Sequence, residues 1–391
     1  MRHQYGDFQL EIYRAGTKGV LPRYPVDAES LERKAAEALP PWILSYVAGG
    51  CGNEHTQRAN IAAFEKWGLV PRMFNGSYQR DLSVEMFGLR LPTPLFTVPI
   101  GVIGICSPDF HGDLNVARAA ARTGVTVVQS TLSMDPMEDL APALGETPGF
   151  FQLYTPKDRD LAVSLIQRAE AAGYKAIVVT LDTWVTGWRP RDLNAANFPQ
   201  LRGYCLSNYF TDEHFLKRLA RKPEDDPAAA AAEWAGLFGY SVTWDDLAWM
   251  REATSLPVLV KGISHPDDAR KAVDLGVSGI YCSNHGGRQA NGGLPALDTL
   301  PDIVEAVGGA GGVPVLFDSG VRNGTDAVKA LALGATAVGI GRSYAYALAL
   351  GGEDGLVHYL RSVLAEADLL MAIDGYPTLA DLRAASLRRI T

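Results

Sequence analysis

Ile280-Tyr281-Cys282-Ser283-Asn284-His285-Gly286-Gly287-Arg288-Gln289 is the stretch at which a predicted strand ends and a predicted site begins. An amide, an imidazole, two glycines and a guanidinium follow the strand, and they stabilise neither a strand nor a helix interior. The paired glycines allow unusual backbone conformations, so His285 and Arg288 can face the same small space. A guanidinium binds a carboxylate and an imidazole can act as a base on the neighbouring atom. The stretch therefore predicts chemistry on the carbon next to a carboxylate. The alternative is a polar turn after the strand, in which the histidine only forms hydrogen bonds within the protein.

On both sides of this stretch, short apolar runs alternate with longer helical segments. We expect eight strands, at residues 94–99, 125–129, 149–153, 176–181, 258–260, 279–282, 315–317 and 337–340. Buried parallel strands have such continuous apolar runs, and eight strand-helix units predict an α/β fold, a (β/α)₈ TIM barrel. A doubly wound open sheet is the alternative, but no strand-to-helix turn carries G-x-G-x-x-G or a P-loop.

The chain is predicted to be a single domain of residues 1–391. An N-terminal helical extension (1–91) is polar and turn-rich at its start and irregular over residues 54–91. It precedes a barrel (92–375) and a C-terminal tail (376–391). The long insertion after the fourth strand, residues 184–242, is predicted to be an active-site lid. The competing interpretation is a membrane-binding insert. The charged and scattered polar residues of the insertion argue against that interpretation.

Composition excludes several classes of function. The 391 residues carry a formal net charge of −8, which argues against a nucleic-acid surface. The four cysteines have no zinc or disulfide spacing, so we expect reduced thiols, no metal site and a cytoplasmic protein. Neither a signal peptide nor a membrane span is expected from the hydrophobic pattern.

Polar side chains follow nearly every predicted strand, where barrels carry their chemistry. Glycines and arginines after the seventh and eighth strands predict a phosphate site. Lys261 ends the fifth strand and offers a positive charge to an electron-rich ring. Together these features predict flavin mononucleotide (FMN), with a substrate between its ring and His285. The residues at these strand ends include Pro99, Ile100, Gly101, Ser130, Gln152, Thr180, Lys261, Asp318, Gly320, Arg322, Gly341 and Arg342.

The chain resembles the FMN-dependent 2-hydroxy-acid oxidising enzymes from about residue 30 to its end. The motifs that carry the resemblance are Ser283 to Gln289, Phe151-Gln152-Leu153-Tyr154, Thr180-Leu181-Asp182-Thr183, Leu259-Val260-Lys261-Gly262 and Asp318-Ser319-Gly320-Val321-Arg322. Within the family it looks most similar to lactate 2-monooxygenases, through residues 44–50, 54–60 and 187–192 and the extended insertion.

The resemblance implies catalytic roles. His285 would be the base that takes a proton while the α-carbon is oxidised, and Asp182 would stabilise its imidazolium. Lys261 would stabilise the reduced flavin. The flavin ring would be bound by Ser130, Gln152 and Thr180, with Pro99, Ile100 and Gly101 also binding the cofactor, and its ribityl chain and phosphate by Asp318, Gly320, Arg322, Gly341 and Arg342. Arg288 would bind the substrate carboxylate with Tyr46, and Tyr154 would lie near the substrate oxygen. Arg189, in the insertion, is a weaker substrate-binding candidate.

Two departures bear on the reaction. Typical oxidases of the family carry Ala at the position of Gly101, and the glycine here resembles the monooxygenases. Leu132 replaces a bulkier aromatic residue found in glycolate oxidase. The implied reaction is L-lactate plus O₂ to acetate, CO₂ and water. The alternatives are an oxidase that releases keto acid and H₂O₂, and a non-catalytic phosphate-ligand binding protein. The family resemblance implies a homotetramer or homo-octamer.

Overall fold

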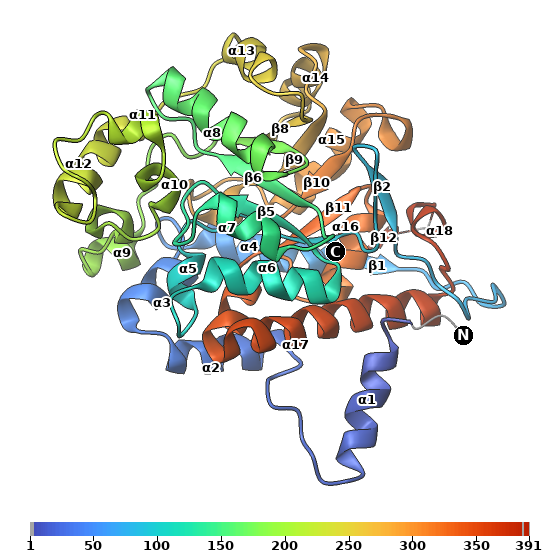
Figure 1. Ribbon diagram of the computed structural model, residues 1–391. Helices are drawn as coiled ribbons and strands as arrows, with labels where there is room; N and C mark the ends of the chain where they lie inside the picture. Colours follow the sequence, from blue (N-terminus) through green and yellow to red (C-terminus); the bar gives the residue numbers. More distant parts are fainter. Residues whose placement is uncertain (1–3, 385–386, 391) are drawn as a thin grey trace.

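The computed structural model describes residues 4–384 and 387–390, and its centre is a closed barrel of eight parallel strands (Figure 1). The strand order around the barrel is β10-β11-β4-β5-β6-β7-β8-β9. The strands are β4 (Leu95–Thr97), β5 (Thr126–Ser130), β6 (Gly149–Leu153), β7 (Ile177–Thr180), β8 (Val258–Ile263), β9 (Gly279–Cys282), β10 (Val315–Phe317) and β11 (Ala337–Ile340). The predicted barrel is confirmed, and the open-sheet alternative is wrong because β4 pairs with both β5 and β11.

Every position of these strands is buried except Gly262 in β8. Burial on both faces explains the continuous apolar runs, since the outer face packs against helices. These helices are α6 (Gly112–Thr123), α7 (Met137–Ala143), α8 (Arg159–Ala172), α13 (Asp246–Glu252), α14 (Pro266–Asp274), α15 (Ala296–Ala306), α16 (Gly324–Ala332) and α17 (Arg342–Asp374), with short α5 (Ile103–Cys106), η3 (His285–Gly287) and η4 (Gly309–Gly311) between them.

The end of β8 is irregular at a position that matters for the site. The pairing of β8 with β9 shifts register between Lys261 and Ile263. Gly262 has a φ of +105°, and a Cβ there would lie 3.0 Å from Cβ of Asp182. Glycine is therefore required where the end of β8 passes close to the residue that follows β7.

The N-terminal extension is more ordered than its sequence indicates. It contains α1 (Asp7–Gly16), α2 (Ala28–Ala38), α3 (Pro41–Ala48), α4 (His55–Ala62), η1 (Ala63–Lys66), β1 (Trp67–Leu69), β2 (Val84–Met86) and β3 (Leu89–Leu91). The expectation of irregular structure over residues 54–91 and of a turn-rich start was thus wrong in part. Tertiary contacts stabilise α1: the ring of Phe8 packs 5.6 Å from that of His358, and Arg361 pairs with Glu11 at 2.6 Å.

The insertion forms a group of helices at one side of the barrel (Figure 1). It contains α9 (Pro190–Asn194), η2 (Pro199–Arg202), α10 (Ser207–Phe210), α11 (Glu213–Leu216) and α12 (Pro227–Leu237). Its core is aromatic: Trp234 stacks on Phe198, with ring centroids 6.5 Å apart, and lies 5.3 Å from Phe238. The insertion is therefore a packed subdomain.

The C-terminal segment completes the fold. Helix α18 (Leu379–Arg383) leads toward β12 (Leu387–Arg389), which pairs antiparallel with β1. Residues 385, 386 and 391 of the predicted tail lie outside the described part of the chain. Among the described helices, none is both long and apolar enough to cross a membrane.

Candidate active site

A cavity opens at the carboxyl ends of the barrel strands. It has about 1330 Å³ of empty space, with solvent at its mouth included. Most of the predicted site residues border it: Tyr46, Pro99, Ile100, Gly101, Tyr154, Arg189, Lys261, His285, Arg288, Asp318, Gly320, Arg322, Gly341 and Arg342. Four predicted residues are not among those that border it: Ser130, Gln152 and Thr180 lie at the carboxyl ends of β5, β6 and β7, and Asp182 follows β7.

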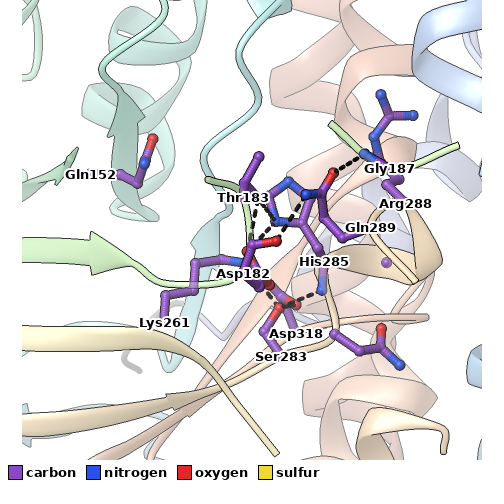
Figure 2. Close-up of polar contacts among 12 residues, drawn as sticks. Gln152, Asp182, Thr183, Gly187, Lys261, Ser283, His285, Arg288, Gln289 and Asp318 are labelled. Atoms are coloured by element: carbon purple, nitrogen blue, oxygen red, sulfur yellow. Dashed lines mark hydrogen bonds and ion pairs between the residues drawn. The ribbon is translucent and has the colours of Figure 1, made fainter. Parts of the chain in front are cut away.

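Figure 2 shows His285 held by two residues that follow β7. His285 Nδ1 lies 2.9 Å from Asp182 Oδ1 and 3.1 Å from Thr183 Oγ1. A carboxylate only accepts hydrogen bonds, so Nδ1 carries the proton and Nε2 has its lone pair free. Among the described residues, none forms a hydrogen bond with Nε2. The ring nitrogen that can act as a base is thus available to a molecule in the cavity.

The Asp182–His285 pair is electrostatically tuned. Burial opposes the charge on Asp182, but His285, Lys261 and the Thr183 hydroxyl outweigh it and lower the pKa of Asp182 to about 2. Burial lowers the pKa of His285, and Lys261 adds repulsion, although Asp182 acts in the opposite direction. At neutral pH the pair is therefore a carboxylate beside a neutral imidazole, the protonation state that a general base requires.

This tuning leads to a prediction about pH. A base must be neutral before it accepts a proton, so we expect the rate of anaerobic flavin bleaching to stay constant down to about pH 6.5 and to fall only below it. Asp182→Asn removes the group that raises the pKa of His285, so the acid limb should move to lower pH while the maximal rate decreases. Stopped-flow absorbance across pH tests both effects. An acid limb above the ordinary histidine value would contradict the assignment.

The backbone at the end of β9 directs His285 into the cavity. His285, Gly286 and Gly287 have φ values of 57°, 63° and 73°, all in the left-handed region. A Cβ at Gly287 would lie 2.6 Å from the backbone nitrogen of Gln57 in α4. The two glycines thus allow both the turn and the close approach of the N-terminal extension.

Lys261 belongs to a buried polar network below His285 (Figure 2). Its Nζ donates to Ser283 Oγ at 2.9 Å and lies 3.5 Å from Asp318 Oδ2. Ser283 Oγ in turn donates to Asp318 Oδ1 at 2.5 Å and accepts from the backbone N–H of His285 at 3.0 Å. The network fixes the ammonium group at the cavity and ties it to the backbone that carries His285.

Two arginines face the cavity around Tyr46. The Arg288 guanidinium lies 4.6 Å and that of Arg189 5.6 Å from the centre of the Tyr46 ring. Arg288 Nη1 donates to the carbonyl oxygens of Tyr46 and Gly49, whereas its Nη2 has no partner among the described residues. The predicted binding of a carboxylate by both terminal nitrogens of Arg288 is therefore not available in this structure, because Nη1 already donates to the backbone. Burial, with repulsion from Arg189, lowers the pKa of Arg288 to about 10, so it remains charged at neutral pH.

Tyr154 borders the same space from the end of β6. Burial raises its pKa, so its phenol stays neutral and can donate a hydrogen bond. Its ring lies 5.9 Å from that of Phe238 in the insertion. Arg189 is 4% exposed and also comes from the insertion, so the segment predicted as a lid supplies part of the cavity wall.

The opposite end of the cavity lies after β10 and β11. Gly320 has a φ of +95°, and a Cβ there would meet the Asn60 carbonyl oxygen at 2.5 Å. Arg322 Nε is buried without a partner among the described residues. Arg342 instead donates to Gln57 Oε1 at 2.7 Å and to the Gly286 carbonyl at 3.1 Å.

Several buried polar atoms fit a bound FMN. Gln152 Nε2, Thr180 Oγ1, Arg288 Nη2 and Arg322 Nε have no hydrogen-bond partner among the described residues. Arg288 and Arg322 border the cavity, whereas Gln152 and Thr180 lie at the carboxyl ends of β6 and β7. Native proteins rarely leave buried donors unpaired, so these donors indicate a ligand rich in acceptors, such as the ring, ribityl chain and phosphate of FMN.

Sequence reasoning missed residues of the N-terminal extension and the insertion. Gln57 and Asn60 border the cavity, and Asn60 exchanges two 2.8 Å hydrogen bonds with Asn284. Phe198 and Phe238 form part of the wall. Their spacing in sequence carries no signal, because only the tertiary fold brings these segments to the barrel mouth. Residues 54–60 were noted only for the family resemblance.

The comparisons with known proteins agree with this geometry. The profile of the FMN-dependent dehydrogenase family matches residues 35–389. The FMN-dependent alpha-hydroxy acid dehydrogenase qulF of Penicillium citrinum is 40% identical over 99% of this chain and 96% of its own length. An L-lactate oxidase of Lysinibacillus sphaericus is 38% identical over 93% of each chain. A solved mandelate oxidase with benzoyl-formic acid is 34% identical, with a TM-score of 0.82 over 93% of this chain and 99% of the other.

The match covers the barrel, the cavity residues and nearly the whole length of each relative, and the unpaired donors fit the same cofactor. The protein is therefore an enzyme, and the non-catalytic binding alternative is wrong. This chain belongs to the FMN-dependent dehydrogenase family, whose members oxidise 2-hydroxy acids with FMN.

Proposed function

We propose that this enzyme oxidises L-lactate and is a lactate 2-monooxygenase, which converts L-lactate and O₂ to acetate, CO₂ and water. The observation that carries the proposal is one cavity bordered by His285, Arg288 and Lys261, in which His285 Nε2 and Arg288 Nη2 have no hydrogen-bond partner among the described residues. These groups complement a carboxylate, a proton to be removed and a ring that gains negative charge.

In the proposed mechanism, each residue has one task. Arg288 and Arg189 bind the substrate carboxylate beside Tyr46, and Tyr154 donates to the substrate hydroxyl oxygen. His285 Nε2 accepts a proton from the substrate, and Asp182 stabilises the resulting imidazolium at Nδ1, 2.9 Å away. The insertion 184–242 acts as the lid, because its Arg189, Phe198 and Phe238 close one side of the cavity.

FMN, when bound, supplies a two-electron acceptor that can pass electrons to O₂. Lys261 would stabilise negative charge on it, and its ring would be held by Ser130 and by Gln152 and Thr180, whose Nε2 and Oγ1 have no partner among the described residues. Asp318, Gly320, Arg322, Gly341 and Arg342 would hold the ribityl chain and phosphate, and Pro99, Ile100 and Gly101 would contact the ring.

The monooxygenase outcome requires that products react before they leave. Lactate and O₂ give pyruvate and H₂O₂, and pyruvate and H₂O₂ then give acetate, CO₂ and water. Gly101 and Leu132 support this outcome because both border the cavity and Gly101 adds no side chain to it. The oxidase, which releases pyruvate and H₂O₂, is the second candidate, since L-lactate oxidases are among the relatives.

Product analysis tests the proposal. Incubation of the purified enzyme with L-lactate under O₂ should yield acetate and CO₂ in proportion to the O₂ consumed, with little free peroxide. Anaerobic bleaching by a panel of 2-hydroxy acids, compared with the D enantiomers, ranks the substrates. Pyruvate and H₂O₂ in equal amounts would establish the oxidase instead, and bleaching only by larger acids would exclude lactate.

We also propose that the enzyme is a cytoplasmic homotetramer or homo-octamer. Its four cysteines are all free and buried, which agrees with a reducing compartment. Sedimentation equilibrium distinguishes these assemblies from a monomer.

A further inference from the structure

Gln200 is a residue of the insertion that reaches the end of the first barrel strand. It lies in η2, is completely buried, and its Nε2 donates to the Gly101 carbonyl oxygen at 2.8 Å. Among the described residues, no other hydrogen bond to that oxygen is found. One amide from the insertion therefore fixes the peptide between Gly101 and Val102.

That peptide forms one side of a narrow gap in the cavity wall. A Cβ on Gly101 would lie 3.1 Å from both Cβ and Cδ1 of Leu132, closer than most carbon contacts. The segment around Leu132 is held by the same insertion, because Asn208 Nδ2 donates to the Thr131 carbonyl at 2.9 Å and to Ser133 Oγ at 3.0 Å. Both sides of the Gly101–Leu132 gap are thus set by buried amides of the insertion.

We propose that Gln200 is a positioning residue: through the Gly101 carbonyl it sets the width of the Gly101–Leu132 gap and so controls whether keto acid and peroxide react in the cavity. The product outcome rests on the proposed monooxygenase function; the positioning of the wall does not. Without the amide donor, the Gly101 carbonyl loses its partner and the segment can move away from Leu132. A wall that has shifted no longer holds peroxide against the keto acid, so peroxide leaves before it attacks.

The chain offers a matched control in Asn197, three residues earlier. Its Nδ2 also donates to one backbone carbonyl, that of Trp42, at 2.7 Å, and like Gln200 its carbonyl oxygen is buried and unpaired among the described residues. The Trp42 carbonyl, however, also accepts from Ser45 Oγ at 3.1 Å. Asn197→Leu thus removes an equivalent insertion contact without freeing a wall carbonyl.

The experiment compares Gln200→Met and Gln200→Glu with Asn197→Leu in the FMN-loaded enzyme. Methionine keeps the volume without a donor, and glutamate keeps the shape but replaces the donor with an acceptor. We expect both Gln200 variants to raise the free peroxide fraction about two- to tenfold, the range for one neutral hydrogen bond. They should also alter the visible circular dichroism of the flavin. Asn197→Leu should lower the melting temperature but change neither readout.

A double-mutant cycle with Gly101→Ala separates positioning from general loosening. If Gln200 acts through Gly101, the effects of Gln200→Met and Gly101→Ala on kcat/KM are non-additive, whereas those of Asn197→Leu and Gly101→Ala add. Additive effects together with an unchanged flavin spectrum would overturn the proposal. If the parent enzyme releases all its peroxide, the monooxygenase function fails, while the flavin spectrum and the cycle still decide the role of Gln200.

Discussion

His285→Gln is expected to retain FMN and to slow anaerobic flavin bleaching by L-lactate on the order of 10²–10⁴-fold. The imidazole is the neutral base of the cavity: Nδ1 is held by Asp182 and Thr183, and Nε2 has no partner among the described residues. Glutamine preserves a polar side chain of similar length but cannot accept the proton. Stopped-flow absorbance of the flavin band under anaerobic conditions measures the effect.

The control for His285→Gln is cofactor content. The visible spectrum before mixing and the melting temperature should both match those of the parent, because His285 is not among the expected FMN-binding residues. Bleaching at the parental rate with FMN in place would mean that another group takes the proton. The base assignment would then have to be abandoned.

Arg288→Lys is expected to lower kcat/KM. The lost transition-state stabilisation should be about 2–5 kcal/mol, which is the cost of breaking a buried, charged, hydrogen-bonded pair. Lysine keeps the charge but lacks the planar guanidinium of arginine. In Arg288, Nη1 donates to the Tyr46 and Gly49 carbonyls, and Nη2, which has no partner among the described residues, is left for a ligand. A single ammonium group cannot serve both. Steady-state kinetics with L-lactate measures the loss.

Arg189→Lys is the matched comparison, since both guanidinium groups are buried beside the Tyr46 ring. Arg189 donates from Nε to the Arg288 carbonyl at 3.0 Å and from Nη2 to Gln289 Oε1 at 2.5 Å, so more of its fork is bound to protein. We expect a smaller loss of kcat/KM than for Arg288→Lys. Equal or reversed losses would move the main carboxylate-binding role to Arg189.

The insertion links the substrate end of the cavity to the barrel. It supplies Arg189, Phe198 and Phe238 to the wall, and its buried amides bind the segments that follow β4 and β5. Closure of the site and the shape of its wall are therefore set by the same segment.

The barrel and the residue types at its mouth follow from the amino-acid sequence alone. Eight apolar runs predict eight strands because each is buried on both faces, and polar residues at the ends of such strands must gather at one edge. His285, Lys261 and Arg322 could thus be assigned to a common site without coordinates. The glycines of the Ser283–Gln289 stretch predict a turn that other residues avoid, and the structure has it.

Which polar atoms at the site lack a hydrogen-bond partner within the protein depends on how distant segments pack. Asp182 and His285 are 103 residues apart but lie 2.9 Å from each other, and a side chain at Gly262, where β8 is irregular, would contact Asp182. One amine of Arg288 is bound by backbone carbonyls of α3 and the residue after it, Gln57 and Asn60 reach the cavity from α4, and Gln200 reaches Gly101 from the insertion. Local patterns reflect backbone preference and burial, whereas hydrogen bonds between distant segments depend on packing that no short window of sequence encodes.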